Sequence, residues 1–125
     1  MNAPASSVLI IDDDIGAREA FEPMLRAYGY DVRVAVDGQS GVAEMRSRLP
    51  DVLLLDLHLQ DTNGVEFLRR CRGEFPMAIK SAIITGDYLL DESVIRDIEH
   101  LNARIFFKPL WEEDLIRIVR TLISQ

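Results

Sequence analysis

The amino-acid sequence predicts a single α/β domain in which a doubly wound, five-stranded parallel sheet has helices on both faces. Strand-like and helix-like segments alternate five times along the 125 residues, which is the pattern of parallel strands joined by helical crossovers. The strand-like segments are apolar runs without alternation, as expected when both faces of a strand are buried. The length fits one compact domain with a substantial core.

Five short segments are the expected strands. They are residues 8–11, 31–36, 51–56, 82–85 and 105–107. We expect Phe106 and Phe107, in the last of these, to belong to the strand core. Residues 1–7 are small and polar and lack a signal-peptide pattern, so we expect a flexible tail over 1–7 and the domain over 8–125.

The first helix is expected over residues 15–28, where apolar side chains recur at helical spacing. Asp14 precedes it as the expected N-cap, and Gly29 is the expected stop. Pro23 lies inside this segment and should kink the helix, at a cost of about 3 kcal/mol if nothing compensates.

Turn residues and apolar spacing place the other helices. The second follows a turn at residues 37–38 and ends before Pro50, and the third is expected over about 65–71. The fourth has its apolar face within 94–101. The last begins with three acids at 112–114, which suit the positive end of a helix dipole.

The net charge of −7 and the single cysteine exclude several classes of function. An acidic domain repels nucleic acid, so we expect no direct nucleic-acid partner. Cys71 allows no internal disulfide and fits a cytoplasmic protein; we expect it on a helix face against the sheet. The longest apolar stretches have only strand length, so we expect no membrane span.

Four of the expected strands deliver polar side chains to their carboxyl ends, which meet at one edge of a parallel sheet. In chain order these side chains are Asp12 and Asp13, Asp56, Thr85, and Lys108. Clustered carboxylates repel one another, and a hard cation relieves that repulsion. Oxygen ligands without histidine or cysteine point to Mg²⁺. A carboxylate that also acts as a nucleophile would form an aspartyl phosphate, with the lysine and the threonine suited to its oxygens.

These residues occur within four short motifs, which together resemble the receiver domains of two-component response regulators. The motifs are Ile10-Ile11-Asp12-Asp13-Asp14, Asp51-Val52-Leu53-Leu54-Leu55-Asp56, Ile84-Thr85-Gly86 and Phe107-Lys108-Pro109. Their order and spacing match the family over residues 8–123, and the resemblance implies the flavodoxin-like (βα)5 receiver fold. Each motif is weak by itself, but the combination is specific.

The resemblance implies a metal-dependent phosphorylation site. Asp56 matches the phosphorylated aspartate. Asp13 would bind Mg²⁺ directly and Asp12 through water, with the backbone carbonyl of His58 as a further ligand.

The resemblance also implies how the site works as a switch. Lys108 would pair with the phosphoryl group, Thr85 would move toward it, and Pro109 matches a proline that often follows a cis peptide bond. A histidine kinase or a histidine phosphotransfer protein would donate the phosphate, and a downstream effector domain or protein would receive the signal. Such a domain is not a metabolic enzyme, although it weakly catalyses its own phosphorylation and dephosphorylation. Homodimerisation through the fourth helix, fifth strand and fifth helix is possible.

The sequence departs from the family pattern near the site. His58, two residues after Asp56, is an uncommon side chain there, and is either a modulator of aspartyl-phosphate lifetime or a solvated loop residue. Ile105 stands where the family usually has an aromatic residue that couples to the threonine. We therefore expect readout to rest on residues 85–90, with Tyr88 a candidate for the missing ring and Asp87 a second candidate modulator.

A further departure lies outside the site, where residues 101–104 lack the frequent Gly-Ala turn. Trp111 is either an anchor for a partner or a packing residue at the start of the last helix.

Three rival classes fit the residues less well. A phosphatase of the haloacid-dehalogenase type needs a second acid two residues after its nucleophile, where this chain has His58. A pseudo-receiver usually lacks one of the acids or the lysine, and this chain has all of them. A flavodoxin-like carrier of FMN needs a phosphate loop after the first strand, where residues 12–14 would repel a phosphate.

Overall fold

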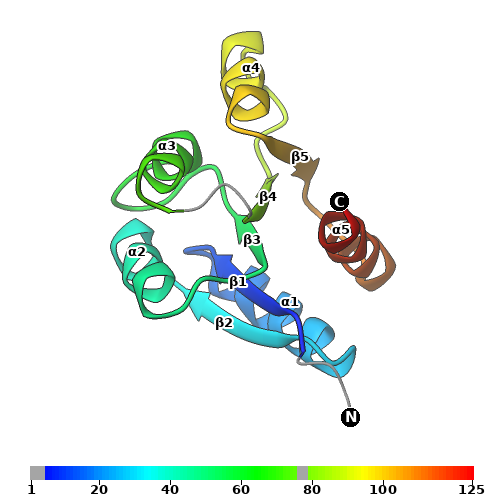
Figure 1. Ribbon diagram of the computed structural model, residues 1–125. Helices are drawn as coiled ribbons and strands as arrows, with labels where there is room; N and C mark the ends of the chain where they lie inside the picture. Colours follow the sequence, from blue (N-terminus) through cyan, green and yellow to red (C-terminus); the bar gives the residue numbers. More distant parts are fainter. Residues whose placement is uncertain (1–4, 76–78) are drawn as a thin grey trace.

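The computed structural model describes residues 5–75 and 79–125, and its centre is one parallel sheet of five strands in the order β2-β1-β3-β4-β5 (Figure 1). The strands are β1 (Ser7–Ile11), β2 (Asp31–Ala35), β3 (Val52–Leu55), β4 (Lys80–Thr85) and β5 (Ala103–Phe107). All of the neighbouring strands pair in parallel. The predicted fold class is confirmed.

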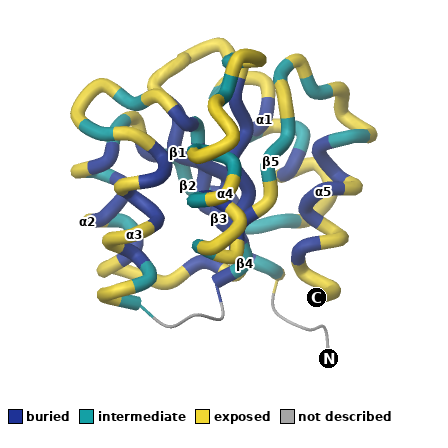
Figure 2. Tube along the Cα trace, turned by 90° about the horizontal axis from the view of Figure 1, so that it is seen from above, coloured by how far each residue is buried: buried dark blue, intermediate teal, exposed yellow. Residues whose placement is uncertain are grey.

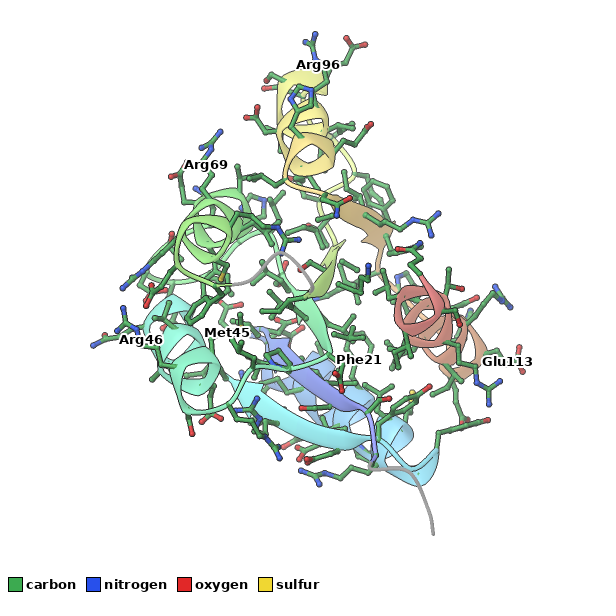
Figure 3. The ribbon with its side chains drawn as sticks, in the orientation of Figure 1. Phe21, Met45, Arg46, Arg69, Arg96 and Glu113 are labelled. Atoms are coloured by element: carbon green, nitrogen blue, oxygen red, sulfur yellow. The ribbon has the colours of Figure 1, made fainter. Side chains whose placement is uncertain are left out.

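The helices follow the strands in strict alternation. They are α1 (Ile15–Ala27), α2 (Gly38–Ser47), α3 (Gly64–Glu74), α4 (Glu92–His100) and α5 (Glu112–Ser124). Helices α1 and α5 cover one face of the sheet, and α2, α3 and α4 cover the other (Figure 1). Figure 3 shows Phe21 of α1 and Met45 of α2 pointing inward on opposite sides of the sheet, whereas Arg46, Arg69 and Arg96 extend away from it.

Residues 8–11 of β1 and the whole of β3 are apolar because helices bury both faces of these central strands (Figure 2). In β1, Leu9 and Ile11 belong to the core beneath α2, α3 and α4, and Val8 and Ile10 belong to the core beneath α1 and α5. Successive strand residues point to opposite faces, so one run of four apolar residues serves two cores. This arrangement explains why the sequence shows no alternation.

The start of β1 differs from the prediction by one residue. Ser7 was expected in the flexible tail, but it is buried and is the first residue of the strand. Its N–H donates to Oδ2 of Asp51 over 2.7 Å, and its carbonyl accepts from the N–H of Asp51. Residues 1–4 of the expected tail lie outside the described part of the chain.

Side-chain caps set the starts of the first three helices. Asp14 caps α1 by accepting from the N–H of Gly16, as predicted, and the helix continues through the exposed Pro23. Asp37, expected in the turn before the second helix, is the N-cap of α2, and Gly38 is already the first residue of the helix. Asn63 caps α3, which extends beyond the predicted 65–71 at both ends because Gly64 and residues 72–74 are also helical.

The turn between α4 and β5 uses asparagine where the family often has glycine. Asn102 adopts a positive φ of 59°, a left-handed conformation that asparagine tolerates better than most residues. Arg72 of α3 supports the turn by donating from Nε to the carbonyl of Leu101 over 2.8 Å. The unusual sequence at 101–104 therefore still makes a tight turn.

Two side chains outside the site were correctly placed by the sequence, and one was not. Cys71 is buried on α3 against the sheet, as expected, and burial raises the pKa of its thiol to about 11. Phe106 packs against the core shared with α1 and α5. The prediction that Phe107 belongs to the core was wrong, because β5 is an edge strand and leaves this residue 41% exposed.

Candidate functional site

The carboxyl edge of the sheet brings together the side chains that the sequence placed at strand ends. Ligand oxygens of Asp12, Asp13 and Asp56 all lie within 4.8 Å of one another. Lys108, after β5, reaches into the same group. Residues from both sides of the central strand β3 thus meet at one point, which we call the carboxylate pocket, made of Asp12, Asp13, Asp56 and Lys108.

Asp12 is the most deeply held member of the pocket, with only 3% of its surface exposed. Its Oδ1 accepts from the N–H of Asp14 over 2.9 Å, and its Oδ2 accepts from Nζ of Lys108 over 2.8 Å. Arg18 of α1 donates to the Asp12 carbonyl over 2.6 Å. Both carboxylate oxygens of Asp12 are therefore already hydrogen-bonded, whereas Asp13 is exposed at the rim.

Asp56 lies opposite, half-buried at the end of β3. Its Oδ2 is 3.3 Å from Nζ of Lys108. Burial and the repulsion of Asp12 raise the pKa of Asp56, and the attraction of Lys108 opposes them only in part. The ionised carboxylate is consequently less stable here than in water.

Lys108 is the cation of the pocket. Burial lowers the pKa of its ammonium, but hydrogen bonds and charge attraction from Asp12 and Asp56 outweigh burial, so the pKa lies above its ordinary value. The pocket therefore holds three carboxylates against one ammonium group. A divalent cation would complete the neutralisation of the pocket. The carboxylate oxygens of the pocket are ligands that suit a hard metal ion.

Thr85 closes β4 beside the pocket and is fully buried. Its Oγ1 accepts from the N–H of Asp87 over 3.1 Å, and its carbonyl accepts from the N–H of Lys108 over 2.9 Å. The threonine is thus hydrogen-bonded to the loop after β4 and to the lysine after β5.

His58 and Asp87, two candidate modulators from different loops, touch each other. The Nε2 atom of His58 lies 2.9 Å from Oδ2 of Asp87, although the His58 side chain is 65% exposed. The hydrogen bond from His58 lowers the pKa of the Asp87 carboxyl, and the N–H of Leu89 adds to the effect. The loop after β3 and the loop after β4 are therefore linked by a side-chain contact.

The other two candidate modulators differ in exposure and in the residues they contact. Tyr88 is exposed, and its hydroxyl donates to the carbonyl of Lys108. Ile105 is half-buried and packs against the core that contains Ile98 of α4. The ring of Tyr88 lies against the ring of Phe107, and its role in place of the missing aromatic residue stays a prediction.

Sequence reasoning missed two residues that shape the pocket. One is Arg18, whose link to the Asp12 carbonyl depends on how α1 leaves the pocket. The other is Gly64, where an added Cβ would lie 2.9 Å from the Asp56 carbonyl oxygen. Glycine at position 64 lets α3 approach the end of β3. In the sequence, the only feature that could have indicated this close approach is a turn glycine directly after Asn63.

The fold and the site together define a class of protein. A five-stranded parallel sheet with paired acids after β1, an acid after β3 and a lysine after β5 is the architecture of a signalling receiver domain. Comparison with known families agrees, because residues 8–120 match the response regulator receiver domain. The chain belongs to this family.

Individual relatives support the same conclusion. The transcriptional regulatory protein TrcR of Mycobacterium tuberculosis is 43% identical over 123 residues, which cover 94% of this chain and 45% of TrcR. The DNA-binding response regulator MtrA of the same species is 28% identical and is matched by 100% of this chain over 54% of its own length. The chain therefore spans about half the length of these relatives.

A solved structure shows the same fold. The CheY-like response regulator receiver domain protein from Methanospirillum hungatei superposes with a TM-score of 0.87 at 26% identity, covering 96% of this chain and 94% of the other.

Within residues 5–75 and 79–125, no helix is both long and apolar enough to cross a membrane.

Proposed function

We propose that this domain is a phosphorylation switch in which Asp56 accepts a phosphoryl group from a histidine kinase or a histidine phosphotransfer protein in a Mg²⁺-dependent reaction. The observation that carries the proposal is the carboxylate pocket, where the three acids lie within 4.8 Å and Lys108 reaches Asp56. Family membership supports it. The phosphorylated domain would then signal to an effector domain or protein.

The residues present fit a magnesium ion. Asp13 and Asp56 offer carboxylate oxygens, and the His58 carbonyl follows two residues after Asp56 in the same loop. Both oxygens of Asp12 are hydrogen-bonded, to Asp14 and Lys108, which favours an indirect role for Asp12 through water. When bound, Mg²⁺ supplies charge neutralisation for the transferring phosphoryl group.

The transfer itself is a displacement at phosphorus. A carboxylate oxygen of Asp56 forms a new O–P bond as the N–P bond of the donor phosphohistidine breaks, and the leaving imidazole keeps the electron pair. Lys108 would stabilise the negative charge on the phosphoryl oxygens, as it now stabilises the carboxylates. Thr85 lies at the end of the adjacent strand with a hydroxyl that can donate to the same oxygens.

Three neighbouring residues would modulate this switch. His58 and Asp87 bridge the two loops beside Asp56, and Ile105 packs with α4 in place of a mobile ring. The rigid, β-branched side chain of Ile105 favours a readout through the loop after Thr85. TrcR is named a transcriptional regulatory protein and MtrA a DNA-binding response regulator, so the remainder of such a protein is a natural effector.

The test is covalent labelling with acetyl phosphate in Mg²⁺, followed by mass spectrometry. We expect one phosphoryl group, at Asp56, that is lost in hot alkali as an acyl phosphate is. Asp56→Asn should not be labelled, whereas Asp51→Asn, at the other end of β3, should be labelled as the native protein is. Label that persists in Asp56→Asn, or no label in the native protein, would refute the proposal.

A further inference from the structure

Tyr88 makes two specific contacts with the end of β5 although it is 63% exposed. Its hydroxyl donates a hydrogen bond to the carbonyl oxygen of Lys108. Its ring centroid lies 5.7 Å from that of Phe107, with the two rings inclined by 31°. An exposed ring that is held at both its face and its hydroxyl has a defined position.

The contact with Tyr88 completes the hydrogen bonding of the Lys108 main chain. The N–H of Lys108 donates to the carbonyl of Thr85 over 2.9 Å, and the carbonyl of Lys108 accepts from Tyr88. Thr85 is the last residue of β4 and Tyr88 lies in the loop that follows it, so both partners belong to the segment 85–88. The main chain of Lys108 is therefore held on both sides by this segment, while its ammonium reaches Asp12 and Asp56.

The segment that carries Tyr88 is itself shaped by Thr85. The N–H of Asp87 donates to Oγ1 of Thr85 over 3.1 Å, and the N–H of Leu89 donates to Oδ1 of Asp87 over 3.0 Å. These two local turns shape the loop from which the Tyr88 side chain reaches the end of β5. A change in the hydrogen bonding of the Thr85 hydroxyl would thus shift the loop that carries Tyr88 and, through the Tyr88 hydroxyl, the main chain of Lys108.

We propose that Tyr88 is a positioning residue for Lys108, which it holds through the lysine carbonyl, and that it couples the Thr85 loop to the ammonium that meets the phosphoryl group. The inference rests on the proposed function, because Lys108 matters only if Asp56 is phosphorylated. It also gives Tyr88 a role different from that of the family aromatic residue. Ile105 already packs against α4, so Tyr88 acts through its hydroxyl rather than by filling space.

The experiment compares native protein, Tyr88→Phe and Tyr28→Phe in Mg²⁺ and acetyl phosphate. Tyr88→Phe keeps the ring and removes only the hydroxyl, whereas Tyr28 is an exposed tyrosine at the end of α1, remote from the lysine in the fold. We expect Tyr88→Phe to be labelled about five-fold more slowly, which corresponds to about 1 kcal/mol for one hydrogen bond. Tyr28→Phe should match the native rate, and both variants should melt as the native protein does.

An amide NMR comparison of beryllofluoride complexes, which imitate the acyl phosphate, separates positioning from general damage. In Tyr88→Phe the shift changes at Thr85 and Lys108 should shrink, while those at Asp12–Asp14 remain. Native labelling rates together with native shifts at Lys108 in this variant would overturn the inference and leave the proposed function intact. A native protein that takes no label would instead overturn both.

Discussion

At the amino edge of the sheet, Arg72 and Asp51 bind backbone groups, whereas at the carboxyl edge Asp12, Asp56 and Lys108 face one another. Arg72 at the amino edge donates to the carbonyls of Leu101 and Ile79 over 2.8 and 3.1 Å, and Asp51 accepts from the N–H of Ser7. At the carboxyl edge, Asp12 and Asp56 share one ammonium group. The contacts at the amino edge give polar groups hydrogen-bond partners. The contacts at the carboxyl edge bring carboxylates together, and a bound cation can relieve their repulsion.

This difference means that the two edges should respond oppositely to substitution. Removing Arg72 at the amino edge takes hydrogen bonds away from partly buried carbonyls, which destabilises the fold. Removing a carboxylate at the carboxyl edge relieves repulsion, which stabilises the fold but abolishes the chemistry. Stability and phosphorylation should therefore be separable by position.

The largest effect is expected at Arg72. Its guanidinium joins α3 to the start of β4 and to the turn before β5, through Ile79, Ser81 and Leu101. Arg72→Met should lower the free energy of unfolding by about 3 kcal/mol, measured by urea denaturation, because three partly buried hydrogen bonds of one guanidinium are lost together. Arg96→Met, at an exposed arginine of α4 (Figure 3), should change it by less than about 0.5 kcal/mol. Equal losses in both variants would remove the contrast between the two edges.

Magnesium should stabilise the carboxyl edge by a comparable amount. At a hundred times its dissociation constant a ligand adds about 2.7 kcal/mol to the free energy of unfolding. Asp13→Asn should melt at a higher temperature than native protein in EDTA, because one repelling charge is gone, and should lose the response to Mg²⁺. A native melting curve that is indifferent to Mg²⁺ would contradict the metal site.

A smaller effect follows from the raised pKa of Asp56. The pKa of Asp56 in the folded state lies above the ordinary value of 3.8, so folding favours the protonated carboxyl. The protonated carboxyl stabilises the fold fully below pH 3.8, and this stabilisation is lost as the pH rises through the folded pKa. Asp56→Asn should therefore be more stable than native protein at pH 7 in EDTA, by about 1 kcal/mol. The difference should vanish below pH 3.8, which melting curves across pH can test. If Asp56→Asn is less stable than native protein at pH 7, the ionised Asp56 carboxylate stabilises the fold, which contradicts the prediction.

The sequence was sufficient for the features that depend on chain order. Strand periodicity and the parallel topology bring Asp12, Asp56 and Lys108 to one edge without any knowledge of side-chain contacts. The burial of Cys71 followed from helical spacing in the same way.

The sequence was insufficient where a contact depends on how two segments pack. Phe107 looked like a core residue, but its burial depends on whether a sixth element covers β5, and in this fold β5 is an edge. The contact of His58 with Asp87 joins two loops that are 29 residues apart. The hydroxyl contact of Tyr88 was likewise hidden, because the sequence suggested only a ring.

The link between His58 and Asp87 is a hydrogen bond at the carboxyl edge in which both polar groups have a partner, as the polar groups around Arg72 do at the amino edge. It joins the loop after Asp56 to the loop after Thr85, over 2.9 Å between Nε2 and Oδ2. Both side chains are polar, and the backbone N–H of His58 lies 3.5 Å from Oδ1 of Asp56, the carboxylate whose phosphoryl group a hydrolytic water would attack. The pair could therefore either orient that water or shield the phosphoryl group from it.

The smallest predicted effect concerns this pair and the lifetime of the aspartyl phosphate. His58→Ala should change the rate of dephosphorylation by about three- to five-fold, since one exposed hydrogen bond contributes about 1 kcal/mol. Asp87→Ala should change it in the same direction, and the double variant should show no further change, because each single substitution already breaks the link. His100→Ala is the control, because His100 is the other histidine of the chain and lies exposed on α4. Decay of the phosphorylated protein, followed by mass spectrometry after donor removal, measures all four variants. If the effects of His58→Ala and Asp87→Ala simply add, the two side chains act on the phosphoryl group separately, and their hydrogen bond is only a contact between exposed loops.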